Sequence, residues 1–199
     1  MVSRMNQSTR RLLFLLFFLS GFCSLVYQVI WTRMAFASFG IITPVLSVVL
    51  SVFMLGLAVG AWAGGRLVGP GVKKIGRSAA FLYAGAELMI GLGGAFAVPK
   101  LFRLGEHCLL AAGQTNSLHY LFFSALVLAI SIFPWCVFMG ATFPLMMAYV
   151  REQDGQNQES FSYLYLANVL GAMSGTLWTA LVSGGNIGVS HNPLGCRSL

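Results

Sequence analysis

Long apolar runs separated by short polar or basic segments dominate the chain. A helix needs about 20 mostly apolar residues to cross ~30 Å of hydrocarbon at 1.5 Å per residue, and five runs are long enough. They cover residues 12–33, 41–65, 78–98, 118–150 and 161–184. The pattern predicts an all-α, polytopic transmembrane bundle of about five spanning helices. A basic lead (1–11) precedes it and a polar tail (185–199) follows it, and we expect that tail to be a truncated end.

Small residues recur at every fourth position in two of the runs. In the second run they are Gly56, Gly60 and Gly64. In the last run they are Ala167, Gly171, Gly175 and Thr179. Residues at this spacing share one helical face, and without large side chains that face lets another helix backbone lie close. We expect the last stripe to receive the second helix or another member of the bundle.

A compact basic turn separates the second and third runs. It holds Arg66, Lys73, Lys74 and Arg77. Because Lys and Arg in short loops stay on the cytoplasmic side, the turn predicts that the second helix ends and the third begins in the cytoplasm. With the N-terminus also inside, eight of the twelve Lys and Arg fall on cytoplasmic segments: Arg4, Arg10, Arg11, Arg66, Lys73, Lys74, Arg77 and Arg151.

Glu87 is the most informative single residue. It falls near the middle of the third run, where an ionised carboxylate costs several kcal/mol unless it is protonated, paired or hydrated. Tyr83, one turn earlier, is its expected hydrogen-bond neighbour. Gln28 and Asn168 are expected to face other helices and bond there. Two interpretations of Glu87 stay open: an acid that fastens two helices, and a proton relay or cation-binding group.

Three local patterns concern interfaces and breaks. Trp31 and Arg33 are typical of an interfacial belt at the outer surface. Residues 99–117 predict an interfacial amphipathic helix, with Leu101, Leu104, Cys108 and Ala112 on its apolar face. The fourth run measures about 50 Å as a straight helix, so we expect Pro134 and Pro144 to kink it, or a broken helix at a substrate site.

Composition agrees with a membrane protein and disfavours other classes. The chain is 57% hydrophobic and 9% charged, against about a quarter charged in soluble domains. Its net charge of +7 lies in the N-terminal segment and short loops, so nucleic acid is not an expected partner. The cysteines (Cys23, Cys108, Cys136, Cys196) and the histidines His107 and His119 lack metal-ligand spacing. We expect no metal, no cofactor and no catalytic group of residues in this chain.

Three blocks carry a family resemblance. They are SGFCSLVYQVIWTR (20–33) leading to Phe39-Gly40, then SVFMLGLAVG (51–60) through GRL (65–67) to YAGAELMIG (83–91), and MGATFPL (139–145) followed by YLANVLGA (165–172). Their order over 12–180 resembles the membrane region of prokaryotic proteins in which major-facilitator-like helices are fused to a spermidine synthase-like domain. Gln28 stands where that family commonly has an acid. Val68-Gly69 replaces the Ala-Asp usual in the major-facilitator signature.

The resemblance implies a major-facilitator-like half in a prokaryotic cytoplasmic (inner) membrane and a link to polyamines. It also implies an aminopropyltransferase domain, which we do not expect in this chain. The expected function is a membrane module that anchors or scaffolds a polyamine-related synthase domain or chain. The alternative is a small transporter or half-transporter for a cationic metabolite such as a polyamine, with Glu87, Gln28 and Asn168 lining its interior.

Overall fold

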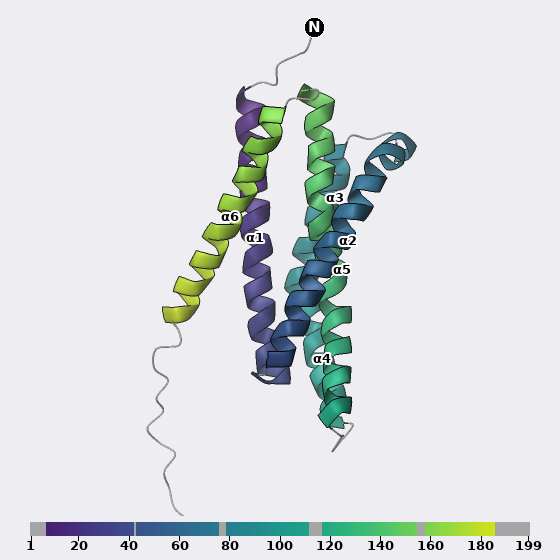
Figure 1. Cartoon of the computed structure of the whole chain (residues 1–199), viewed down its shortest axis with the longest axis vertical. Helices are drawn as coiled ribbons and strands as arrows, with labels where there is room; N and C mark the ends of the chain where they lie inside the picture. Colours follow the sequence, from purple (N-terminus) through teal and green to yellow (C-terminus); the bar gives the residue numbers. More distant parts are fainter. Residues whose placement is uncertain (1–6, 42, 76–78, 112–116, 155–157, 186–199) are drawn as a thin grey trace, which may run out of the picture.

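The computed structural model describes residues 7–41, 43–75, 79–111, 117–154 and 158–185, and its described elements are all helices (Figure 1). In chain order they are α1 (Gln7–Phe39), α2 (Thr43–Ile75), α3 (Ala79–Leu92), the π-helix η1 (Gly93–Ala97), α4 (Val98–Ala111), α5 (Ser117–Asp154) and α6 (Gln158–Gly185).

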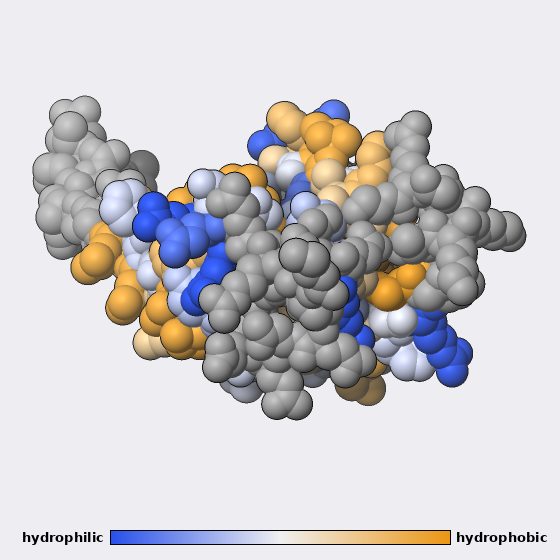
Figure 2. All heavy atoms as spheres, turned by 90° about the horizontal axis from the view of Figure 1, so that it is seen from above, coloured by the Kyte–Doolittle hydropathy of each residue, from blue (hydrophilic) through white to orange (hydrophobic). Residues whose placement is uncertain are grey.

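Five stretches of the described chain are long and apolar enough to cross a membrane. They are Gln7–Phe39, Thr43–Val68, Ala79–Leu109, Leu118–Arg151 and Ser162–Val182. The outside of the bundle is correspondingly apolar, with Leu118, Phe122 and Leu181 among its exposed side chains. Viewed from the end where α1 begins, hydrophobic residues lie around the flanks and hydrophilic ones among them on the end face (Figure 2). The predicted all-helical fold with about five spanning helices is confirmed.

The helices alternate in direction and form two groups. The upper end of the bundle in Figure 1 holds the first residues of α1, α3 and α6 and the last residues of α2 and α5. The most extensive contacts join α2 to α5 and α1 to α6, whereas α3 and α4 pack on α5. The α1–α6 pair therefore stands beside a larger group built on α5.

Glycines explain the closeness of α2 and α5. A methyl group at Gly60 would overlap the carbonyl of Val137, and one at Gly64 would sit 2.8 Å from Cγ of Pro144. In return, Gly140 of α5 lies against the backbone of Leu57. Since each helix offers the other a surface without side chains, the two backbones approach directly.

The second stripe packs against α1 rather than α2. Gly171 and Gly175 lie against the backbone carbonyls of Phe18 and Phe22, and Gly21 of α1 lies against the backbone of Asn168. Both helix pairs therefore use the same device, with glycine on each side of the contact. The expectation that α6 receives some member of the bundle holds for α1.

The third span is longer than predicted. The helix was expected to end at 98 and to be followed by a separate interfacial helix over 99–117, but α3, η1 and α4 follow one another without interruption to Ala111. Val98 and Phe102 are fully buried in the core, whereas Leu104 and Cys108 of the expected apolar face are exposed. The π-turn offers a reason, because the Val98 N–H bonds to the Gly93 carbonyl and so shifts the register just before Pro99.

Trp31 is a core residue, so its predicted interfacial position is wrong. Its side chain is 1% exposed, and its Nε1 donates to the carbonyl oxygen of Gly94 at 3.3 Å. Tyr27 stacks on Trp31 with 5.4 Å between ring centroids, and both rings lie against the bare Cα of Gly94. The indole therefore ties α1 to η1, while Arg33 stays exposed.

The fourth span continues through both of its prolines. α5 is a single helix with Pro134 and Pro144 inside it, so the alternative of a broken helix is not what the described residues adopt. The hydroxyls of Ser131 and Thr142 donate to the carbonyls of Val127 and Met139, within the same helix. Such back-bonding satisfies polar side chains where water is absent.

Candidate functional site

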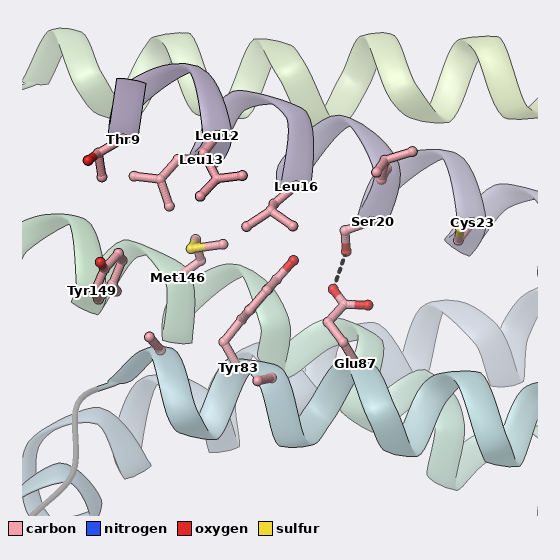
Figure 3. Close-up of a pocket in the computed structure, with 13 residues that line it drawn as sticks. Thr9, Leu12, Leu13, Leu16, Ser20, Cys23, Tyr83, Glu87, Met146 and Tyr149 are labelled. Carbon is pink, nitrogen blue, oxygen red and sulfur yellow. Dashed lines mark hydrogen bonds between the residues drawn. The ribbon is translucent and has the colours of Figure 1, made fainter. Parts of the chain in front are cut away.

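Glu87 lies where α3 faces α1. The Ser20 hydroxyl of α1 donates a hydrogen bond to Oε1 of Glu87 at 2.7 Å (Figure 3). Tyr83, one turn earlier on α3, points its hydroxyl into the same gap and interacts with both side chains. Tyr83 is 8% exposed and Glu87 is half-buried. We call Ser20, Tyr83 and Glu87 the polar cluster.

A cavity of about 520 Å³ borders the polar cluster. One wall is a row of α1 leucines, Leu12, Leu13, Leu16 and Leu19. α3 contributes Ala80 and Ala84, and α5 contributes Met146 and Tyr149 (Figure 3). Along α1 the lining runs from Thr9 to Cys23, roughly 20 Å at 1.5 Å per residue. The cavity therefore extends from the first turns of α1 to the depth of Glu87.

A second cavity, of about 290 Å³, lies next to the polar cluster. Ser20 and Tyr83 line both cavities, and Asn168, Ser24 and Thr142 line the second one only. The two cavities therefore adjoin at Ser20 and Tyr83.

The structure brings together three of the four predicted polar residues. Glu87 and Tyr83 share the first cavity, and Asn168 borders the second with Tyr83. Gln28 lines neither cavity; it is half-buried, and its backbone carbonyl accepts a hydrogen bond from Thr32 at 2.8 Å.

Ser20 is the functional candidate that residue patterns missed. It lies in an apolar run four residues before Ser24, whose hydroxyl bonds back to the carbonyl of Ser20. Two hydroxyls one turn apart mark a polar face on an otherwise apolar helix. That spacing is the signal that points to Ser20.

The predicted basic turn is largely helical. α2 extends to Ile75 instead of ending at 65, so Lys73 and Lys74 belong to the helix, and Arg77 lies outside the described residues. The Arg66 guanidinium sits 4.3 Å from the centroid of the Trp62 ring, a cation–π contact along α2.

Charge at the same end of the bundle continues on α1. The Arg10 guanidinium lies 4.7 Å from the ring centroid of Tyr163 in α6. Arg10 therefore points to the α6 side of α1 and does not line the larger cavity.

Chemically, the site offers one carboxylate, two hydroxyls and an apolar cavity. Within the described part of the chain, no three His, Cys, Asp or Glu side chains gather as a metal site would require. A carboxylate in such surroundings is suited to holding a cation or exchanging a proton.

Fold and site together define a helical membrane protein with five candidate spans and an acid within the third. Comparison of the chain with protein-family models, curated proteins and solved structures finds no match. The resemblance to fused major-facilitator/spermidine synthase proteins therefore stays a prediction based on the three sequence blocks.

Proposed function

We propose that this chain is a membrane-embedded binding module for an organic cation, acting as a transporter or half-transporter with Glu87 as the cation-binding group. One observation carries the proposal: the Glu87 carboxylate, held by Ser20 at 2.7 Å, borders a cavity of about 520 Å³. Small-molecule sites commonly measure about 300–1,000 Å³. An acid in apolar surroundings is costly to ionise alone, and a bound cation offsets that cost.

The arrangement of the two cavities supports transport rather than binding alone. The larger cavity follows α1 inward from Thr9 to Cys23, and the smaller one lies beside it, lined by α1 from Phe17 to Leu25 and by Asn168 of α6. In many transporters the substrate site lies inside the membrane between groups of helices, as the polar cluster does between α1 and α3. In the proposed orientation, with the start of α1 in the cytoplasm, the larger cavity faces the cytoplasmic side.

A second candidate is favoured by the hydrogen bonding of Glu87. Ser20 and Tyr83 already interact with the acid, and the Ser20 bond joins α1 to α3. On this alternative the acid fastens the bundle, and the chain anchors or scaffolds a synthase-like domain or a separate chain. Glu87 then has no ligand.

Uptake into proteoliposomes distinguishes the two candidates. We expect the purified chain to accumulate at least one organic cation from a labelled panel of hexylamine, putrescine, spermidine and tetraethylammonium, and Glu87→Gln to lower that uptake at least tenfold. Leu88→Ala is the matched control, because Leu88 is the next residue on α3 and is 63% exposed on the outside of the bundle. Circular dichroism checks that each variant is folded.

Absence of any Glu87-dependent uptake or binding of an organic cation would reject the transport proposal. The anchoring alternative would then remain, and it predicts that Glu87→Gln leaves membrane insertion intact.

A further inference from the structure

We propose that the ligand of this site is a primary monoamine with an apolar tail, rather than a polyamine. The inference rests on the proposed function and names the substrate class of the same site. It follows from the charge, the shape and the hydrogen-bonding groups of the larger cavity.

The charge of the cavity matches a single ammonium group. Among the described residues that line it, Glu87 is the one acid. A second ammonium of a polyamine would lie beside leucines in apolar surroundings, with no second acid among the described lining residues, which is strongly unfavourable.

The shape of the cavity matches an apolar tail. Leu12, Leu16 and Leu19 follow one another along one face of α1 and lead to Ser20, as Figure 3 shows for the first two. Ala80 and Ala84 form the facing wall on α3, and their small side chains leave room for a chain of methylene groups. A tail lying here would exchange water for leucine contacts.

The polar cluster matches the three N–H donors of a primary ammonium. Glu87 offers carboxylate oxygens, and the hydroxyl oxygens of Ser20 and Tyr83 keep lone pairs that accept hydrogen bonds. Because Arg10 lies over Tyr163 on the α6 side, its charge does not oppose a cation inside the cavity.

Two ligands of equal length test the inference directly. Hexylamine and 1,6-diaminohexane share a six-carbon chain and differ by one ammonium group. Isothermal titration of the full chain in detergent should give at least tenfold tighter binding for hexylamine. From ethylamine to hexylamine, affinity should rise up to roughly fourfold per methylene group buried. Hexan-1-ol, which lacks the charge, reports partition into the micelle.

Variants separate the contribution of the acid from that of the tail pocket. Glu87→Gln should weaken hexylamine binding at least tenfold and leave the hexan-1-ol signal unchanged. Ala84→Leu keeps the acid, suits a helix and fills the cavity, so it should weaken hexylamine more than ethylamine. Leu88→Ala, on the outer face of α3, should leave both affinities within twofold of the native chain.

The possible failures are distinguishable. Equal or tighter binding of 1,6-diaminohexane would overturn the monoamine class while leaving Glu87 as a cation site. Absence of Glu87-dependent binding of every amine would overturn the inference and the proposed function together. Phosphatidylethanolamine carries the same ammonium group, so hexylamine binding is repeated in phosphatidylcholine nanodiscs with and without that lipid. Competition by the lipid would overturn the assignment to a free amine.

Discussion

Ser20 supplies a hydrogen bond to an acid that would otherwise meet mainly apolar side chains. Its bond to Glu87 crosses between α1 and α3, two helices that otherwise contact each other little. Ser24, one turn later, bonds only within its own helix in the described contacts. Two similar hydroxyls on one helix therefore have different roles. The Ser20 hydroxyl joins α1 to α3, and the Ser24 hydroxyl bonds to the backbone of α1.

Replacing Ser20 should destabilise the bundle, and replacing Ser24 should not. Ser20→Ala removes a donor to a carboxyl group, and we expect a loss of about 1–2 kcal/mol in the free energy of unfolding. Ser24→Ala is the matched control, with an expected change below ~0.5 kcal/mol. Reversible unfolding in mixed detergent micelles, followed by circular dichroism, measures both.

A double-mutant cycle with Glu87→Leu, which removes the accepting oxygen, then isolates the pairwise coupling. A coupling energy near zero between the Ser20 and Glu87 substitutions would contradict the assigned hydrogen bond.

For single residues, the sequence predicts which side chain is unusual but not which side chain of another helix it contacts. Glu87 stands out because a lone acid in an apolar run is costly, and Tyr83 follows from helical spacing. Ser20 is 67 residues away along the chain, and its role depends on how α1 is rotated about its axis. The position of Trp31 could not be predicted for the same reason. Aromatic residues occur both at membrane interfaces and in cores, and the hydrogen bond from Trp31 to the Gly94 carbonyl, which places it in the core, is a tertiary contact.

Two helix pairs in this protein are held together by glycines on one helix that lie against the backbone of the other helix. The pairs α2–α5 and α1–α6 both have glycines on each partner, at positions where a Cβ atom would collide with the opposite chain. Apolar side chains gain little by leaving lipid for each other, so close backbone contact is the main source of specificity. These contacts set the two groups of the fold.

Two glycines in α2 give a matched test of this packing. Gly60→Ala places a methyl group against the Val137 carbonyl and should lower the free energy of unfolding by about 1–3 kcal/mol. Gly65→Ala has nothing within 4 Å of the added Cβ, so it should be neutral or slightly stabilising through helix propensity. Unfolding in mixed micelles compares the two, and equal losses for both would contradict the close contact.

Spacing alone was enough to predict the glycine faces of α2 and α6, because residues four apart share a side of any helix. The ends of the helices were harder to predict. Arg66 and Pro99 both look like ends, yet α2 runs on to Ile75, and η1 adjusts the register just before Pro99. Such an adjustment depends on the tertiary contact of Gly93 and Gly94 with tryptophan rings, which no local pattern contains.

The whole molecule places its cavities where its two helix groups meet. Both spaces are lined by α1 on one side and by α3 and α5 on the other, and the smaller one also by α2 and α6. The volume of these cavities depends on the angle and the distance between the α1–α6 pair and the group of helices built on α5. The sequence therefore indicates an intramembrane polar site, while the size and the apolar lining of the cavity, on which the monoamine proposal rests, come from the assembled bundle.

The same assembly gathers most basic residues at one end, which gives a prediction of orientation. Arg10, Arg11, Arg66 and Arg151 lie at or near the helix ends where α1 begins, and positions 73 and 74 follow in α2. Because Lys and Arg near span ends favour the cytoplasm, we expect this end to face inward. The larger cavity then begins on the cytoplasmic side, at Thr9.

Cysteine labelling on intact cells tests this orientation. Ile41 lies between the first two spans and is 83% exposed, whereas position 73 lies in α2 beyond the span that ends at Val68. With Cys23, Cys108 and Cys196 changed to serine, a membrane-impermeant maleimide should label Ile41→Cys from outside at least tenfold more than Lys73→Cys. Permeabilised cells should label both equally. The reverse preference would place the start of the larger cavity outside the cell and would make any transported amine enter it from there.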